Sequence, residues 1–343
     1  MSDLDIIFQY EDEAFPGPSH FLPWGLNQAA HQAGIRVFLD GFDGDTTVSH
    51  GGVYFTELAR QGQWEAFVLE AKAISQHFDT SPHDLLNCYG LMHLTELAKS
   101  WHWVALAIAV SQIHQHFDVS RRHLFLQYGL KPLVPEPIRQ FWQGLRGRSP
   151  SVNSLAPLVN RSFAERIGLD KRIQALDGTK DPPLTATQEH WRNLTSGMFV
   201  FILEQVDQYA AAFSIEARHP FMDKRLIEFC LALPPEQKIH QGWTRMVMRR
   251  ALANILPETI RWRGGKTDMT PNFLHGLLHL DHKLLDEVML NKLGSIERYI
   301  DSDFLWAAYQ RITSGGKVNE QDVMTVWKAI ILALWYDHTK MTP

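Results

Sequence analysis

The sequence predicts a mostly helical protein of the α/β class, in which an incomplete parallel sheet is followed by a helical C-terminal body. One run, residues 35–39, is apolar and β-branched and lies between Gly34 and Asp40, which is typical of a buried parallel strand. In most of the remaining chain the apolar residues recur at helical spacing. Because a lone strand leaves its backbone groups unpaired, we expect its neighbour either at residues 6–9 or outside the chain.

The helices follow from apolar stripes and from capping residues. A helix is expected over residues 26–33, and another begins near Thr46, after the strand. In the helix that opens at Asp223, Leu226, Phe229 and Leu233 form the expected buried stripe. The other helical segments are expected at residues 64–74, 85–97, 103–113, 187–212, from Thr244 onward, and 322–335.

Composition excludes several classes of protein. The 343 residues carry 33 Lys and Arg against 38 Asp and Glu, a net charge of −5, so there is no electrostatic footprint for nucleic acid. The longest apolar runs, at 103–110 and 329–335, are too short to span a bilayer. Cys88 and Cys230 cannot form a disulfide framework. We therefore expect a cytoplasmic protein that binds neither nucleic acid nor membrane.

The first candidate site is the loop at residues 39–45, Leu-Asp-Gly-Phe-Asp-Gly-Asp. Ligands bind at the ends of strands in α/β sheets, next to helix N-termini. Gly41 and Gly44 permit a close approach of the backbone to a phosphate. The three aspartates repel one another unless a cation such as Mg²⁺ lies among them. The alternative is a purely structural loop in which Asp45 or Thr46 caps the next helix.

The second candidate site is the segment at residues 213–223, Phe-Ser-Ile-Glu-Ala-Arg-His-Pro-Phe-Met-Asp. Pro220 biases the residue before it away from the helical region, so we expect an extended turn between two helices. Glu216, in an apolar turn beside Arg218, is a candidate general base or orienting group. The alternative is a structural ion pair between these two side chains.

The third candidate site is the segment at residues 257–268, in which basic side chains surround Gly264 and Gly265. A loop that presents Arg263 and Lys266 suits a phosphate or pyrophosphate group. The segment lacks the spacing of a P-loop. The alternative is a solvated basic loop.

Together, in this order and at this spacing, the three segments resemble the synthetase domain of the asparagine synthetase family, which includes β-lactam synthetases and lasso-peptide cyclases. The family patterns are Ser-Gly-Glu-Gly-(Ala/Ser)-Asp-Glu, Glu-x-Arg-x-Pro-Phe-Leu-Asp, and Arg-x-Lys or Arg-x-x-Lys after Leu-Pro-x-x-(Ile/Val). The resemblance is strong over 190–275 and weaker over 30–52. It implies a nucleotide-binding-type sheet like that of the adenine nucleotide α-hydrolases. The expected units are a remnant of the ATP-binding domain with a helical extension at 1–130, and a helical C-terminal part at 131–343.

The resemblance also implies a chemistry. The family activates a carboxylate with ATP and Mg²⁺ to an acyl-adenylate, and an amine then displaces AMP to form an amide. Asp45 matches the Mg²⁺ ligand, Glu216 the residue that orients or deprotonates the amine, and Lys266 the residue that stabilises negative charge on the acyl centre and the departing phosphate. The residues implied in nucleotide binding are Gly41, Phe42, Gly44, Arg263 and Lys266.

The sequence also departs from the family pattern. The family's Ser-Gly-Gly-x-Asp-Ser pyrophosphate loop is absent, and only 40 residues precede Gly41. We therefore expect a separate N-terminal subunit that supplies this loop, and an exposed edge of the sheet. Phe42 and Thr46 replace the two loop glutamates, which favours a lasso-peptide-type macrolactam cyclase subunit beside asparagine synthesis. A non-catalytic remnant or scaffold that binds a peptide is the remaining alternative.

Overall fold

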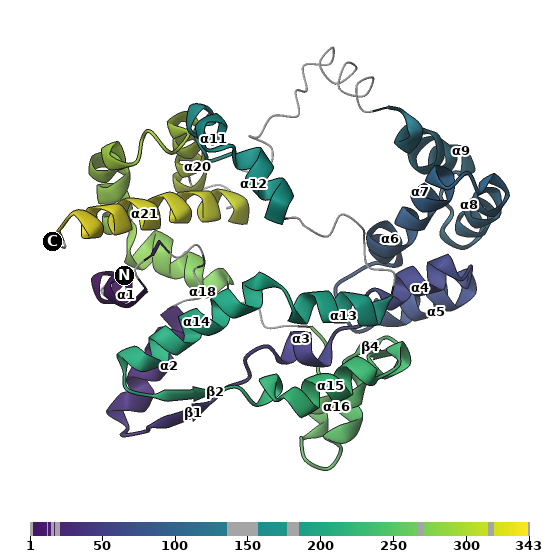
Figure 1. Ribbon diagram of the computed structural model, residues 1–343, viewed down its shortest axis with the longest axis horizontal. Coiled ribbons are helices and arrows are strands. Elements are labelled where there is room, and N and C mark those ends of the chain that lie inside the picture. The colour runs from purple at the N-terminus through teal and green to yellow at the C-terminus, as the bar shows by residue number, and fades with distance from the viewer. Residues whose placement is uncertain are drawn as a thin grey trace.

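The computed structural model describes residues 3–11, 13–14, 17, 21–135, 157–176, 185–265, 270–314 and 319–341. Helices predominate in this part of the chain, and the strands in it form two small sheets (Figure 1). The N-terminal elements are α1 (Leu4–Glu11), α2 (Phe21–Gln32), β1 (Val37–Leu39) and α3 (Gly44–Val48). The described helices include none with the length and apolar character needed to cross a membrane.

A lobe of helices follows α3 and lies on one side of the molecule (Figure 1). Its core is built from aromatic and aliphatic side chains that include Phe55, Trp64, Phe67 and Leu106. The elements are α4 (Tyr54–Arg60), α5 (Trp64–Ile74), α6 (Pro82–Leu85), η2 (Leu86–Gly90), α7 (Leu91–Lys99), α8 (Trp103–Phe117), α9 (Arg121–Leu124), η3 (Phe125–Leu130) and η4 (Lys131–Leu133).

The central segment carries the second and third candidate sites. Its first helices are α11 (Arg161–Ile167), α12 (Leu169–Leu176), α13 (Ala186–Leu194) and α14 (Gly197–Ala212). They are followed by β2 (Glu216–Arg218), η6 (Pro220–Met222), α15 (Lys224–Ala232), η7 (Pro235–Gln237), β3 (Ile239–His240), β4 (Trp243–Thr244), α16 (Met246–Ala251) and α17 (Glu258–Arg261).

A second core joins the two ends of the chain. Ile7 and Phe8 of α1 belong to the same buried cluster as Trp327 and Ile330 near the C-terminus, and α1 lies beside the long last helix (Figure 1). The C-terminal elements are α18 (Thr270–His275), η8 (Gly276–Leu280), α19 (His282–Glu287), η9 (Val288–Lys292), η10 (Leu293–Ser295), α20 (Ser302–Thr313) and α21 (Glu320–Met341). The boundary expected at residue 130 stays a prediction.

The small parallel sheet corrects the sequence prediction at three points. β1 pairs with β2 in parallel, with Phe38 opposite Ala217, so the parallel direction is confirmed. Residues 6–9 belong to helix α1, and the neighbouring strand comes from the segment expected to form a turn. The strand is also not buried on both faces, because Val37 is 37 % and Leu39 64 % exposed.

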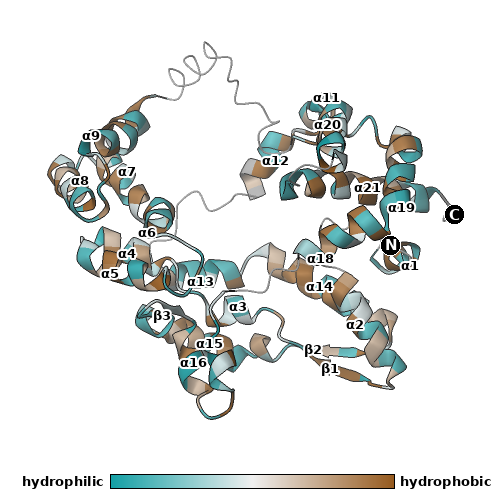
Figure 2. Cartoon of the chain, turned by 180° about the vertical axis from the view of Figure 1, so that it is seen from behind, coloured by the Kyte–Doolittle hydropathy of each residue, from teal (hydrophilic) through white to brown (hydrophobic). Residues whose placement is uncertain are grey.

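The inner face of β1 explains why the strand stays on the body of the protein. Phe38 packs with Ala217 against a small cluster that contains Ala30 of α2, Ala210 of α14 and Ile215. The outward-facing residues of β1 leave a hydrophobic strand at the periphery of the molecule (Figure 2). A parallel sheet is normally covered on both faces, but this face of β1 is exposed. Among the described residues β1 has β2 as its strand neighbour, and its other edge carries no strand.

Most of the expected helices are present, but one buried stripe is wrong. The 64–74 and 103–113 segments coincide with α5 and α8, and the C-terminal segment with α21. In α15, Asp223 caps the helix as expected, since its side chain accepts a hydrogen bond from the backbone N–H of Arg225. Phe229, however, is 55 % exposed, and Cys230 is the buried residue of this helix. Because α15 packs against both α3 and α13, the face that it buries differs from the face that its apolar residues predict.

Gly242 gives a testable account of how the central segment docks on the helical lobe. The residue has φ +77°, and a Cβ atom there would lie 2.3 Å from the carbonyl oxygen of Ala73. Gly242→Ala is expected to lower the free energy of unfolding by about 2–4 kcal/mol, from left-handed strain and overpacking together. Gly62, with φ +70° and open space around it, is the matched control, and Gly62→Ala should cost only about 1 kcal/mol. Equal losses in urea unfolding would refute the close packing.

Candidate functional site

The pairing of β1 with β2 brings the first two candidate segments together. The backbone N–H of Asp40 donates to the carbonyl of Arg218, at 3.2 Å, directly after the paired strands. The Asp40 carboxylate then accepts from the backbone N–H of Phe42, at 3.0 Å, and lies 2.9 Å from Nδ1 of His219. The Phe42 ring packs against the His219 ring, with centroids 5.3 Å apart. Asp40 is therefore a positioning residue that ties one loop to the other.

The next close contact between the two segments is at Gly44. A Cβ atom at this position would lie 3.1 Å from the ring of Phe221. Asp43 precedes it in the left-handed conformation, with φ 60°, and occupies the N-cap of α3 without a side-chain capping hydrogen bond. The expectation that Asp45 or Thr46 caps this helix is therefore wrong. Both residues lie within the first turn of α3, after its N-cap.

A cavity of about 370 Å³ lies between these loops and α16. Its described lining residues are Gly41, Asp43, Gly44, Asp45, Phe221, Arg245 and Met248. The structure thus brings together three of the residues implied by the sequence, Gly41, Gly44 and Asp45. Phe42, the fourth residue of that loop, packs on His219 at the side of the cavity. Burial raises the pKa of Asp43, a hydrogen bond from Thr46 opposes that shift, and the charge of Asp45 adds to it.

Arg245 is a site residue that the sequence analysis missed. Its guanidinium forms an ion pair with Asp45 and donates a hydrogen bond to Nε2 of His50, at 3.1 Å. The residue has φ 55° and ψ 39° at the N-cap of α16, a conformation that side-chain-bearing residues adopt at a cost. Neither the left-handed backbone nor the packing of α16 beside α3 is visible in a sequence pattern.

Glu216 is placed differently from the expectation. Its carboxylate pairs with Nε of Arg218 at 2.8 Å, and the two side chains are 60 % and 58 % exposed. The apolar surroundings expected for Glu216 are therefore wrong, and the ion pair of the structural alternative is present. The role of Glu216 toward an amine stays a prediction.

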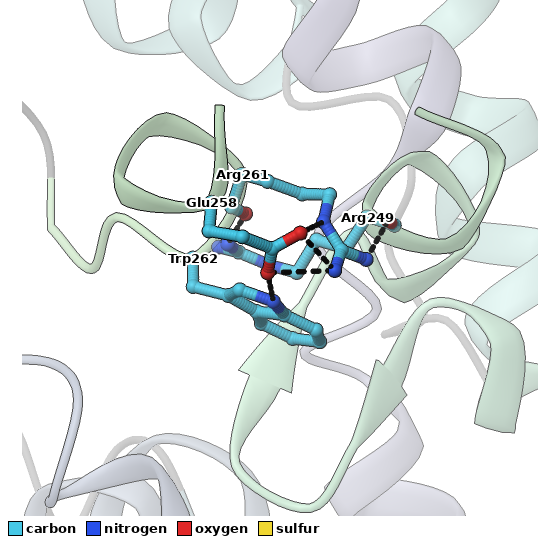
Figure 3. Close-up of polar contacts among 4 residues, drawn as sticks. All are labelled: Arg249, Glu258, Arg261 and Trp262. Atoms are coloured by element: carbon cyan, nitrogen blue, oxygen red, sulfur yellow. Dashed lines mark hydrogen bonds and ion pairs between the residues drawn. The ribbon is translucent and has the colours of Figure 1, made fainter. Parts of the chain in front are cut away.

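The third segment is held by arginine, tryptophan and backbone carbonyl groups (Figure 3). Arg249 donates to the carbonyl groups of Thr244, Arg261 and Arg263, and its guanidinium lies 4.4 Å from the ring centroid of Trp243. Burial and the charge of Arg245 lower the pKa of Arg249. These contacts are structural, because they tie α16 to β4 and to the backbone of Arg261 and Arg263 in the basic segment.

Glu258 completes this arrangement by joining Arg261 to Trp262. Its carboxylate accepts from Arg261 and, at 2.9 Å, from the indole N–H of Trp262 (Figure 3). The Arg261 side chain is only 15 % exposed, so the alternative of a fully solvated basic loop is wrong for this residue. Lys266 lies outside the described residues.

A second cavity, of about 320 Å³, adjoins the first. Arg263 lines it together with arginine and aliphatic side chains from α16 and α17, and the two cavities share Arg245 and Met248. Arg263 and Asp45, which are about 220 residues apart in sequence, therefore belong to neighbouring cavities with one arginine between them. The shared wall is the geometric link between the first and third candidate segments.

A buried pair of basic residues lies near α3, and one of the two belongs to α13, which packs against α3. Lys238 is fully buried, and its Nζ lies 3.2 Å from Nδ1 of His190, which is 1 % exposed. An ammonium group only donates, so Nδ1 of His190 accepts and the ring is neutral. Burial and the charge of Lys238 lower the pKa of His190 to about 4. Burial also lowers the pKa of Lys238, and the neighbouring Cys230 and Glu57 oppose the shift.

The neutral state of His190 predicts how stability depends on pH. In the unfolded chain the imidazole has its ordinary pKa of 6.5, against about 4 in the folded protein. Between these values the unfolded chain binds a proton that the folded chain excludes. The contribution of neutral His190 to the free energy of unfolding is therefore complete above pH 6.5 and is lost as the pH falls toward 4. It should amount to about 2 kcal/mol between pH 7 and pH 5.

The comparison variant is His190→Gln, which retains an acceptor for Lys238 but does not titrate. Urea unfolding of both proteins between pH 5 and pH 7.5 measures the difference. A parallel loss of stability in the two proteins would contradict the assignment of a neutral buried His190.

Comparisons with known proteins place the chain in a family. A family model described as asparagine synthase matches residues 1–337. Glutamine-hydrolyzing asparagine synthetase 3 of Bacillus subtilis is 37 % identical over 110 residues, which are 32 % of this chain and 17 % of the relative. The Cricetulus griseus enzyme is 29 % identical over 120 residues, 32 % of this chain and 21 % of the relative.

The human asparagine synthetase is 28 % identical over 122 residues, 33 % of this chain and 22 % of the relative. The matched segments thus span 17 to 22 % of the length of these curated relatives. No solved structure matches the chain. Because the family match extends over nearly all of its residues, the chain belongs to the asparagine synthase family.

Proposed function

We propose that this chain is part of an ATP-dependent carbon–nitrogen ligase, which activates a carboxylate as an acyl-adenylate and transfers the acyl group to an amine. The observation that carries the proposal is the cavity beyond the carboxyl ends of β1 and β2, where Asp45 faces Arg245. Ligands of open parallel sheets bind at this edge. Family membership supports the class of reaction, and the cavity supports the proposed location.

The residues around this cavity fit a nucleotide with its divalent cation. Gly41 and Gly44 present backbone without side chains, which suits a phosphate group. The described residues form no cluster of three or more metal-ligating side chains, and Mg²⁺ is commonly held by one or two carboxylates together with substrate phosphates. Asp45 would be the main protein ligand, and Arg263 would face the pyrophosphate from the second cavity. Bound Mg²⁺ supplies charge neutralisation on the phosphate oxygens.

Two further residues have proposed roles in the chemical steps. Lys266 would stabilise the negative charge that develops on the acyl centre and on the departing phosphate. The described end of its segment is fixed, because a Cβ atom on Gly264 would lie 2.2 Å from the carbonyl oxygen of His77. Glu216 would orient the attacking amine and accept its proton after release from Arg218.

A separate N-terminal subunit is proposed to supply the pyrophosphate loop. The support is the outer surface of the small sheet, where Val37 and Leu39 are exposed although parallel strands are normally covered on both faces. Strands that pair with the free edge of β1 would extend the sheet and bring a loop to the same end of it, and the rest of the partner would cover the exposed face. The partner is therefore expected to bind through β1.

A macrolactam-forming cyclase subunit is the second candidate. Its support is the packing of Phe42 against His219, which puts an aromatic ring beside the cavity at the position where the related loops carry a glutamate. An aromatic ring at this position favours an amine carried by a peptide over free ammonia. A non-catalytic remnant that binds a peptide would share this ring but would not transfer adenylate.

ATP–pyrophosphate exchange tests the proposed adenylation. The full-length natural protein, alone and with any upstream-encoded partner, is assayed with candidate carboxylic acids and labelled pyrophosphate. Lys266→Ala should lower exchange on the order of 10²–10³-fold, the usual loss of one electrostatic stabiliser of the transition state. Lys224→Ala is the matched control, since Lys224 is 86 % exposed. Absence of exchange in every preparation would refute the ligase and leave the peptide-binding remnant.

Glu216→Gln separates the two half-reactions. Because Glu216 is assigned to the amine, the variant should keep ATP–pyrophosphate exchange and slow amide formation about 10²–10⁴-fold, as for loss of a general base. Single-turnover conversion of preformed adenylate measures the second step. An equal loss in both half-reactions would show that Glu216 acts on adenylation or on the fold instead.

A further inference from the structure

The ion pair between Arg245 and Asp45 occupies the carboxylate that the proposed function assigns to a cation. Nη2 of Arg245 contacts Oδ1 of Asp45, while Nε2 of His50 lies 3.8 Å from Oδ2. The side chains of Arg245 and Asp45 are 28 % and 40 % exposed. The pair is thus partly removed from water. In such a position opposite charges attract more strongly than at an open surface.

The backbone of Arg245 is held in place, whereas one polar atom of its side chain is left without a partner by this pairing. Its left-handed conformation is maintained by the hydrogen bond from the N–H of Met246 to the carbonyl of Lys238, at 3.2 Å. Nε of Arg245 is buried and has no hydrogen-bond partner among the described residues. An unmet buried donor is costly, so an acceptor on a ligand at the shared wall of the two cavities would stabilise it.

We propose that Arg245 is an internal counter-ion of Asp45, which an anionic polyphosphate ligand draws away so that Asp45 can accept a divalent cation. The inference rests on the proposed function for the identity of the ligands, nucleoside polyphosphate or pyrophosphate. Its consequence is that cation and anion bind cooperatively at this site, and that the cation alone binds weakly.

Electrostatics accounts for the direction of this coupling. A divalent cation beside the guanidinium would repel it, and an anion beside Asp45 would be repelled by the carboxylate. When both ligands are present, Arg245 faces the anion, Asp45 faces the cation, and each repulsion is replaced by an attraction. By linkage, the anion must raise the affinity for the cation as much as the cation raises the affinity for the anion.

The first experiment measures binding of Mn²⁺ alone to the full-length protein by electron paramagnetic resonance. Arg245→Gly removes the counter-ion, and glycine adopts the left-handed backbone without strain. The variant should bind Mn²⁺ about fivefold more tightly, corresponding to the upper range for a partly exposed ion pair. In the double variant, Arg245→Gly with Asp45→Asn, this gain should be absent, because the carboxylate that binds the cation is gone. Arg250→Ala, on the same helix, is the matched control with unchanged affinity.

The second experiment measures the anion without any cation. In the presence of EDTA, Asp45→Asn should bind labelled pyrophosphate about fivefold more tightly than the natural protein, because Arg245 is released. Arg245→Gly and the double variant should both bind it more weakly. Circular dichroism and urea unfolding verify that each variant is folded before either ligand is added.

The outcomes distinguish this inference from the proposed function. Unchanged or weaker Mn²⁺ binding by Arg245→Gly overturns the counter-ion role, and so does weaker binding of pyrophosphate by Asp45→Asn in EDTA. Neither assay requires turnover. If both predicted gains are found but no preparation exchanges pyrophosphate into ATP, the role of Arg245 stands and the ligase proposal fails.

Discussion

The site depends on the parallel pairing of two strands of three residues each. Asp40 and His219, which follow these strands, are 179 residues apart in sequence, so the pairing closes a long loop that local structure cannot close. Once Phe38 lies opposite Ala217, the contacts of Asp40 with His219 and of Gly44 with Phe221 follow from the register. A slip of one residue would turn Phe38 outward and separate the loops.

Helix α3 is also held in place by packing against other helices and by a buried pair of basic residues. The helix has only five residues, which is too short for stability of its own, and it packs against α13 and α15. Between these elements lies the buried pair of Lys238 and His190. A Cβ atom on Gly51, with φ +75°, would lie 2.8 Å from Cβ of Lys238, so the chain that leaves α3 runs directly along this pair. A buried ammonium that must keep its acceptor restricts how far α3 can move.

The sequence predicted the local parts of this structure better than the contacts between them. Stripes such as Trp64, Phe67 and Ala71 predicted α5, because helical periodicity is a local property. The strand β2 was not predicted, since Glu-Ala-Arg has no alternating pattern and its partner is distant in sequence. The three segments of the candidate site were found by motif, but the contact of Asp45 with Arg245 was not. That contact depends on one left-handed residue and on where α16 lies in the fold.

The arginines beside the second cavity differ in what an anion can do to them. Arg249 donates to three backbone carbonyl groups and lies over Trp243, so moving it would break the fold of the segment. Arg261 is held by Glu258 of its own helix and by the carbonyl of Arg249. Arg245, in contrast, pairs with a carboxylate on another element, that of Asp45. Nε of Arg245 also has no hydrogen-bond partner among the described atoms. Arg249 and Arg261 therefore build the rigid wall, and Arg245 is the cation that can respond to a ligand.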